Sequence, residues 1–406
     1  MHFTLEHGTW QATSEFISRH ATESDTARLA LLARGEPDVD LHFALDQIAG
    51  RQRAKDKLPS WAGHDNIIYP PRLAMEQCSG EATARYKASL TSAGDLMVDL
   101  TGGFGIDCAA IATRFSRAIY VEQNPTLCAI ARHNFATLGL RHIEVVNDTA
   151  EHFLTTLDTP VDLIYLDPAR RDSAGRRTYA ITDCTPDVAQ LAPTLLHLAK
   201  QVIVKLSPML DLRHVATHLP GVNAIHIIGS GGECKELLAI LSNQPADTES
   251  IAVTCHHITT TANQTLHFPL AHTNQPAPVR SGDDTDARHL FEPNPTLMKA
   301  GATALLAKRF GLTTIARDSH LLVGPNDVPN FPGRRFNISA VTSMNKKALR
   351  TALKGITRAN VAVRNFPLTA PELRQRLHLA DGGENYIFGT RLNDGQTRIF
   401  ICTKAE

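Results

Sequence analysis

Short apolar runs alternate with helix-length segments through the middle of this 406-residue chain. Residues 96–98, 118–121, 163–166 and 201–206 are such runs, each dominated by aliphatic or aromatic side chains. Continuous apolar runs separated by helical segments are typical of parallel strands that are buried on both faces. The pattern therefore predicts a doubly wound α/β domain, in which ligands bind at the carboxyl ends of the strands.

The chain is expected to contain four regions. Before residue 90, apolar residues recur at helical spacing and predict a helical domain. After residue 330 the pattern changes to strand, helix, strand, helix and two strands, and the Asp-Gly pair at 394–395 predicts a hairpin between the last two. The expected regions are a helical domain at 1–89, the α/β domain at 90–242, connecting strands with a small α+β segment at 243–330, and a final region at 331–406.

Charge is unevenly distributed, although the whole chain carries 41 Lys plus Arg against 41 Asp plus Glu. Residues 331–406 contain 13 basic and 5 acidic residues, a net charge of +8, whereas the preceding 330 residues contain 28 and 36, a net charge of −8. A basic region on a neutral chain favours nucleic-acid binding, and a region that is basic only for solubility is the alternative.

The first helix of this basic region is predicted over residues 345–356. Leu349, Leu353 and Ile356 form its apolar stripe, which turns the intervening basic side chains outward. These outward residues are Lys346, Lys347, Arg350 and Lys354.

A glycine-rich turn, DLTGGFGID at residues 99–107, follows the first apolar run. Gly102, Gly103 and Gly105 permit positive φ and a close approach of the backbone to a ligand. Glu122 stands 20 residues after Gly102, at the end of the second run, where an acid commonly binds ribose hydroxyls. The turn therefore predicts a site for a cofactor that contains a nucleoside.

The helix after this turn is expected over about residues 105–117, with free N–H groups at its start for the ligand. A dinucleotide is disfavoured, because Cys108 stands where the third small residue of the G-x-G-x-x-G/A pattern belongs.

A second cluster, DPARRD at residues 167–172, follows the third apolar run and should lie at the same edge of the sheet. Asp167 is the candidate to accept a hydrogen bond or a proton from a substrate, with Pro168 stiffening the turn. Arg170 and Arg171 are candidates to hold a phosphate through two hydrogen bonds each. The alternative is a structural Asp167 that caps a helix or pairs with one of these arginines.

Together, the two clusters resemble class I S-adenosylmethionine-dependent methyltransferases over about residues 90–241. The resemblance implies a Rossmann-like seven-stranded sheet that ends in a hairpin near residues 224–241. It implies that the glycine turn surrounds the methionine end of the cofactor, that Glu122 binds the ribose, and that Asp148 meets the adenine amino group. The cofactor residues that it implies are Asp99, Thr101, Gly102, Gly103, Gly105, Glu122, Gln123 and Asp148, and the catalytic ones are Asp167, Pro168 and Arg170.

The motifs FPGRRF at 331–336, RNFP at 364–367 and DGG at 381–383 resemble a bacterial methyltransferase group with a C-terminal THUMP-like domain. For that group we expect a ferredoxin-like segment before the THUMP-like domain. THUMP domains hold RNA in RNA-modifying enzymes, so the resemblance implies methylation of RNA, on a base of tRNA or rRNA. The expected substrate-binding residues are Arg171, Lys205, Arg334, Arg335, Lys346, Lys347, Arg350 and Lys354.

Some features depart from known RNA methyltransferases. Enzymes that methylate base amino groups usually carry an aromatic residue where this chain has Arg170, and the 5-methyluridine enzymes carry a nucleophilic cysteine where it has Ser207. Two alternatives are therefore kept: a methyltransferase of a protein or small molecule, and a non-catalytic RNA-binding protein that retains the cofactor pocket.

The cysteines and the first residues of the chain bear on disulfides, metal sites and cellular location. Seven cysteines without a C-x-x-C pair argue against a disulfide framework and a zinc site. His256 and His257 are adjacent on a predicted strand and point to opposite faces, so no metal is expected. The start shows no signal peptide and no run reaches the length of a membrane span, so a cytoplasmic protein is expected, with its oligomeric state left open.

Overall fold

The computed structural model describes residues 7–23, 25–169, 181, 184–244, 246–279 and 287–405. The chain divides into two compact units. The first comprises Met1–Asn223 with Leu238–Ala246, and the second comprises Ala224–Leu237 with Asp247–Glu406. The boundary therefore runs through the hairpin formed by β6 (Val222–Ser230) and β7 (Glu233–Leu241).

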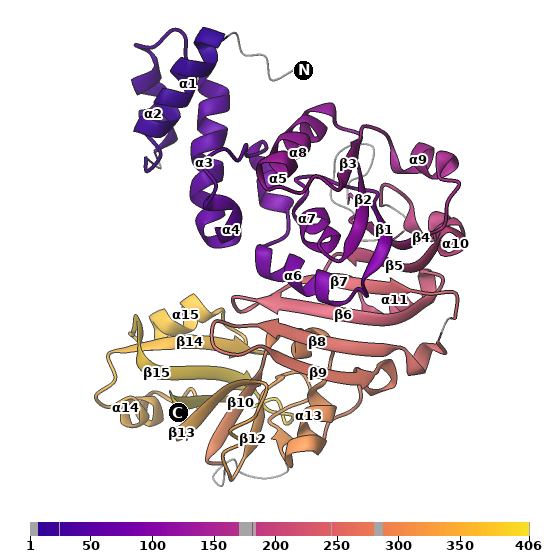
Figure 1. Ribbon diagram of the computed structural model, residues 1–406. Helices are drawn as coiled ribbons and strands as arrows, with labels where there is room; N and C mark the ends of the chain where they lie inside the picture. Colours follow the sequence, from indigo (N-terminus) through magenta and orange to yellow (C-terminus); the bar gives the residue numbers. More distant parts are fainter. Residues whose placement is uncertain are drawn as a thin grey trace. The chain divides into compact units, whose positions relative to one another are not determined.

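Helices occupy the described residues before the first strand, as the apolar spacing predicts. In Figure 1, α1 and α2 lie alongside α3, and their core contains Phe16, Leu29 and Ile48. Helix α3 begins after Asp40, whose side chain accepts a hydrogen bond from the Phe43 N–H at 3.0 Å and satisfies a free donor of the first turn. The helices are α1 (His7–Arg19), α2 (Thr26–Ala33), α3 (Leu41–Lys57), α4 (Pro59–Ala62), α5 (Arg72–Gln77) and α6 (Glu81–Ser89).

The first unit contains a sheet in the order β3-β2-β1-β4-β5-β7. Strands β1 to β5 pair in parallel, and β1 lies centrally, with Met97 opposite Ala118 of β2 and Leu163 of β4. The parallel strands are β1 (Gly94–Asp99), β2 (Phe115–Val121), β3 (Ile143–Val146), β4 (Val161–Leu166) and β5 (Ala199–Leu206). The predicted doubly wound sheet is confirmed.

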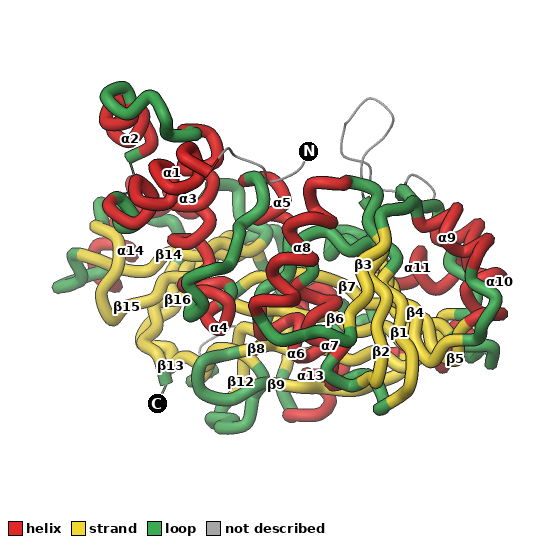
Figure 2. Tube along the Cα trace, turned by 45° about the horizontal axis from the view of Figure 1, so that its top comes forward, coloured by secondary structure: helices red, strands yellow, loops and turns green. Residues whose placement is uncertain are grey.

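Helices cover both faces of this sheet. In Figures 1 and 2, α7 and α8 lie on one side of the strands, and α9 and α10 lie on the other. Right-handed crossovers place them so, because the chain moves outward from β1 to β3 and then reverses direction to β4 and β5. Their bounds, with that of the helix after β5, are α7 (Ile106–Ala112), α8 (Pro125–Thr137), α9 (Ala150–Thr156), α10 (Val188–Leu198) and α11 (Leu212–His218).

The expected length of α7 was wrong, because the helix ends at Ala112 and β2 already begins at Phe115. The carbonyl of Arg114 accepts the Gly94 N–H at 3.1 Å, and this bond aligns the chain beside β1. Phe115 then pairs with Gly94 and is buried in the sheet. Tertiary pairing thus overrides the helical spacing that residues 113–117 display on their own.

The second unit contains two groups of strands. In the first group the order is β7-β6-β8-β9, where β6 and β8 (Ala252–Ile258) are parallel and β9 (Gln264–Pro269) is antiparallel to β8. The second group is a sheet in the order β11-β12-β10-β13-β16-β15-β14. Its strands are β10 (His289–Pro293), β11 (Thr313–Thr314), β12 (Leu322–Gly324), β13 (Gly333–Thr342), β14 (Arg358–Arg364), β15 (Ala380–Arg391) and β16 (Thr397–Lys404).

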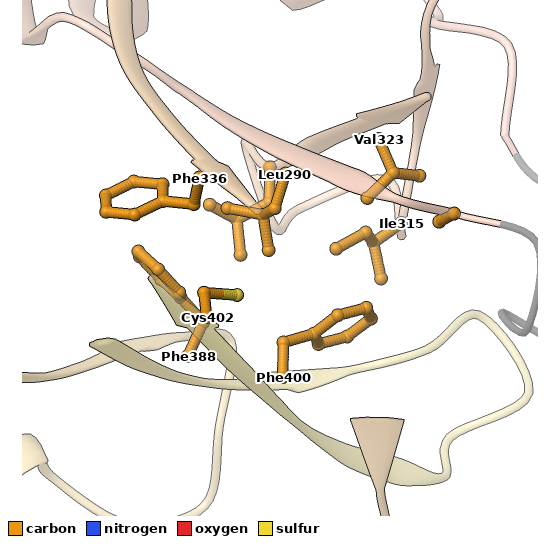
Figure 3. Packing of buried hydrophobic residues seen from close by; sticks show 9 residues of the cluster. Leu290, Ile315, Val323, Phe336, Phe388, Phe400 and Cys402 are labelled. Atoms are coloured by element: carbon orange, nitrogen blue, oxygen red, sulfur yellow. The ribbon is translucent and has the colours of Figure 1, made fainter. Parts of the chain in front are cut away.

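One face of this second sheet carries an aromatic core. Phe336, Phe388 and Phe400 come from neighbouring strands and point toward one another together with Leu290 and Val323 (Figure 3). Because successive side chains of a strand point to opposite faces, the residues between these belong to the other face of the sheet.

The opposite face is covered by α14 (Lys346–Ala352) and α15 (Ala370–Arg376). Leu349, Leu353 and Ile356 pack there against Ile387 and Ile399 of the sheet. The predicted packing of these three residues is confirmed, but the helix predicted over residues 345–356 is too long, because α14 ends at Ala352. The unit also contains α12 (Pro295–Lys299) and α13 (Thr303–Phe310).

None of the helices in the described part of the chain is long and apolar enough to cross a membrane. Across the same described ranges, no three His, Cys, Asp or Glu side chains come together in a group that could hold a metal ion.

Candidate functional site

The carboxyl ends of the parallel strands bring the two predicted clusters together. The Leu100 N–H donates to the Tyr165 carbonyl at 3.0 Å, so the chain stays paired with β4 one residue beyond the end of β1. The Thr101 hydroxyl accepts the backbone N–H of Asp167 at 2.6 Å. This bond joins the glycine turn directly to the second cluster.

The glycine turn is held against an aromatic pair. The Tyr120 hydroxyl donates to the Gly103 carbonyl at 2.6 Å, and a Cβ on Gly102 would lie 2.1 Å from the Tyr120 ring. Gly105 has φ 85°, and a Cβ there would lie 2.8 Å from Phe135. Glycine is thus required at these positions by close packing as well as by backbone conformation.

Glu122 braces the turn from the end of β2. Its two carboxylate oxygens accept the backbone N–H groups of Gly103 at 2.9 Å and Asn124 at 2.8 Å. The Glu122 carbonyl accepts the Asp148 N–H at 3.2 Å, so Asp148 is held beside it. A hydrogen bond from His152, at 2.7 Å, lowers the pKa of the Asp148 carboxyl. Gln123, between the two, is exposed.

Asp99 is the buried acid of the turn, with 1% of its surface exposed. Burial raises the pKa of Asp99 well above its usual value, and nearby Asp107, Asp167 and Glu122 raise it further. The Thr101 N–H, at 3.0 Å, opposes this in part. This edge of the sheet therefore holds a surplus of acidic groups around a buried carboxyl.

Asp167 is half-buried and forms an ion pair with Lys205, from the neighbouring strand β5. Pro168 is buried, and Ala169 forms a two-bond bridge with Thr185 at 2.8 and 3.0 Å. The predicted residues Arg170 and Arg171 lie outside the described residues.

A buried polar network beneath this crevice escaped the sequence analysis. Lys87 of α6 is fully buried, with its ammonium 2.9 Å from Asp107 Oδ1 and 2.7 Å from the Ser79 hydroxyl. Asp107 Oδ2 accepts the hydroxyls of Ser79 and Tyr165, each at 2.7 Å. Burial alone would raise the pKa of Asp107, but the charges of Lys87 and Lys205 outweigh it and hold that pKa at about 2.

One signal could have revealed this network. Asp107 is a charged residue inside a short apolar helix, IDCAAIA, that packs against the sheet. A buried carboxylate requires a partner. Lys87, however, is 20 positions away on another helix, and only the fold brings it close.

The predicted basic residues of the second unit fall into two groups. Arg334 and Arg364 both pair with the buried Glu292, and Arg335 pairs with Asp327. By contrast, the cations of α14 and of the turn directly after it are exposed and have no acidic partner within ion-pair distance among the described residues. These exposed cations are Lys346, Lys347, Arg350 and Lys354.

Comparison with known proteins decides the family. A ferredoxin-like domain model matches residues 289–332, and a THUMP domain-like model matches residues 333–404. A crystal structure of a putative methyltransferase from Porphyromonas gingivalis W83 is 33% identical, with a TM-score of 0.85, and the match covers 97% of this chain and 98% of that one. The chain belongs to this methyltransferase family.

Curated relatives name the cofactor. The methyltransferase is 25% identical over 338 residues to an uncharacterized S-adenosylmethionine-dependent methyltransferase found in two strains of Mycobacterium tuberculosis. The match covers 81% of this chain and 87% of that protein. The predicted activity, an S-adenosylmethionine-dependent methyltransferase with a THUMP-like domain, is thus confirmed, and S-adenosylmethionine is its cofactor.

Proposed function

We propose that this methyltransferase acts on RNA, tRNA or rRNA, which it holds through the α14 surface. That surface is defined here as Lys346, Lys347, Arg350 and Lys354. The supporting observation is that these four cations are exposed and have no acidic partner among the described residues, whereas Arg334, Arg335 and Arg364 are already paired with acids. Unpaired basic side chains that lie close together on the surface attract the phosphate backbone.

Hydrophobic packing presents the α14 surface. Leu349 and Leu353 anchor the helix to the sheet, and the Asn345 side chain accepts the N–H groups of Lys347 at 3.0 Å and Ala348 at 3.2 Å. The helix is thereby fixed at its start and along its apolar side. Its four cations have no remaining structural role that the described contacts indicate.

We assign the cofactor to the turn between Asp99 and Gly105, with Glu122 binding the ribose and Asp148 the adenine edge. The chemistry of the turn supports this assignment. S-adenosylmethionine carries an ammonium and a sulfonium group, and the acidic surplus around Asp99 favours cations. Glu122 retains acceptor capacity, because each of its oxygens accepts one backbone bond and a carboxylate can accept about four.

Asp167 is then the residue that contacts the methyl acceptor. Its backbone bond to Thr101 and its ion pair with Lys205 hold the carboxylate at the same edge as the glycine turn. The bound cofactor supplies an activated methyl group, and Asp167 orients the acceptor toward it through a hydrogen bond. Methyl transfer depends largely on this positioning.

RNA binding is tested with the full-length protein and total tRNA over a range of salt concentrations. Changing all four residues of the α14 surface to alanine should weaken binding and reduce the slope of log K against log salt by up to about 3, at roughly 0.7 for each lost phosphate contact. The matched control changes four exposed cations elsewhere, Arg114, Arg117, Arg141 and Lys308, to alanine. Equal losses in both variants would contradict a specific α14 surface.

Substrate class is tested by transfer of a tritium-labelled methyl group into an extract of cells that lack the enzyme. Label in the RNA fraction is the expected result. Label that enters only protein or small molecules would overturn the RNA proposal and support the alternative acceptors.

The cofactor assignment is tested by calorimetric titration with S-adenosylmethionine. Glu122→Ala should weaken binding at least tenfold, about 1.4 kcal/mol. Glu144→Ala, an exposed acid of the adjacent strand β3, is the control and should bind normally. Unchanged affinity in Glu122→Ala would remove Glu122 from the ribose site.

A further inference from the structure

The acceptor side of the crevice is the end of an alternating row of charges. Lys87 pairs with Asp107, Lys205 acts on Asp107 and pairs with Asp167, and Asp167 faces the site. Only 13% of the Lys205 side chain is exposed, so solvent screens its charge weakly. The positive charge of Lys205 therefore acts on any group that is bound next to Asp167.

Lys205 has little freedom to leave this position. The negative charge of Asp107 attracts the Lys205 ammonium, and the Asp107 carboxylate is itself held by Ser79, Lys87 and Tyr165. An acceptor atom that gives a hydrogen bond to Asp167 lies within about 7 Å of the Lys205 ammonium, since both contact one carboxylate.

This fixed cation distinguishes between acceptor atoms. An amine nitrogen becomes positively charged as it takes the methyl group, and a nearby ammonium opposes that change. A hydroxyl oxygen becomes negative as it loses its proton, and the same ammonium stabilises it. Charge that a site holds ready for the transition state is usually a large part of catalysis.

We propose that the acceptor is a hydroxyl group, which within an RNA chain is the ribose 2′-hydroxyl, with Asp167 taking the proton and Lys205 stabilising the oxygen. The acceptor oxygen bonds to the methyl carbon as the bond from that carbon to sulfur breaks, and the electron pair of that bond stays on sulfur. The proton passes to the Asp167 carboxylate, so the charges balance. The ribose form of this inference rests on the proposed RNA substrate and departs from the expected base.

The site of methylation is tested on labelled RNA from the transfer reaction. Alkali cleaves RNA through a free 2′-hydroxyl, so a 2′-O-methylated nucleotide survives as a dinucleotide. Label in alkali-resistant dinucleotides is the expected result. Label in mononucleotides would overturn the hydroxyl inference while leaving the RNA proposal intact.

A second measurement separates the inference from the RNA proposal. Hot hydriodic acid releases the methyl groups of ethers as volatile methyl iodide and leaves N-methyl groups bound under the same conditions. If the label enters protein or a small molecule, the RNA proposal fails, and release of volatile label still supports a hydroxyl acceptor. Label that stays bound after this treatment overturns the hydroxyl inference, and so does an absence of label from every fraction.

Variants of β5 test the role of Lys205. Lys205→Met should reduce kcat by about 10²–10³-fold, Lys205→Arg should retain more activity, and calorimetry should show cofactor affinity within about twofold of wild type in both. Lys200→Met, at the far end of the same strand, should keep the wild-type rate. A kcat for Lys205→Met equal to or above that of wild type is the result expected for an amine acceptor, and it would overturn the proposal.

Discussion

Each of the two units buries a paired carboxylate, but the basic partners of the two carboxylates differ in their exposure to solvent. Asp107 of the first unit is paired with Lys87, which is fully buried. Glu292 of the second unit has a side chain that is 4% exposed, but its partners Arg334 and Arg364 are 52% and 30% exposed. In the first unit both charges are removed from water, and in the second only the acid is.

This difference follows the surroundings of each carboxylate. The first network lies beneath the crevice, where low solvent exposure strengthens the field that acts on Asp167. The second pair lies beside a core of phenylalanine and aliphatic side chains, and its arginines reach the surface. Arginine suits that place, because its guanidinium remains charged and binds a carboxylate through several donors.

Breaking the first pair should have the largest effect. Asp107→Leu leaves Lys87 buried without its carboxylate and should reduce the free energy of unfolding by about 3–5 kcal/mol. Lys87→Met together with Asp107→Leu should recover a large part of that loss, because neither charge of the pair is left buried without its partner. Urea unfolding of the single and double variants measures both, and a double variant as unstable as the single would contradict the account.

Removing the charge of Glu292, which pairs with Arg334 and Arg364, should reduce the free energy of unfolding less. Glu292→Gln keeps the shape but removes the charge, while both arginines retain access to water, and we expect a loss of about 1–3 kcal/mol. The same urea experiment checks the value. A loss as large as that of Asp107→Leu would show that partner exposure does not distinguish the two pairs.

A third buried carboxyl, Asp99, should make cofactor affinity depend on pH. Its pKa is raised in the folded protein, mainly by burial, so the carboxyl binds a proton at a pH where it would ordinarily be ionised. A cationic cofactor favours the ionised form, so binding should release a proton, and affinity should rise with pH until it passes the pKa of the free protein. Calorimetry from about pH 5 to about pH 9 tests this, and Asp99→Asn should remove the dependence.

The smallest effect is expected from the exposed pair of Lys200 and Asp162. The Lys200 side chain is 80% exposed, and its ammonium lies 2.7 Å from Asp162 Oδ1. Lys200→Met should change the free energy of unfolding by less than about 1 kcal/mol. A larger loss would mean that surface screening is weaker here than the comparison assumes.

Local patterns were sufficient for much of the fold. The apolar runs at β1, β2, β4 and β5 identify buried strands, because a short continuous apolar run between helical segments is typical of a strand that is covered on both faces. The order of elements from β13 to β16, including the hairpin at Asp394 and Gly395, follows from alternation and turn chemistry in the same way.

The candidate site was predictable only where its residues lie next to strand ends. Asp99, Glu122 and Asp167 each follow an apolar run directly, so strand topology brings them to one edge. Lys205 was expected to bind substrate, and its pairing with Asp167 depends on the register of β4 with β5. Local sequence contains no information on such a register.

The sequence by itself determined the α/β class, the glycine turn, the acid after β2 and the basic C-terminal region, because each depends on residues that are close together in the chain. Only the tertiary structure decided which charges are paired. Lys87 reaches Asp107 from another helix, and Arg364 reaches Glu292 across 72 positions. Whether a charge is buried, paired or available to a ligand depends on contacts that form only when the chain folds, and it is these contacts that distinguish the α14 surface from the arginines beside it.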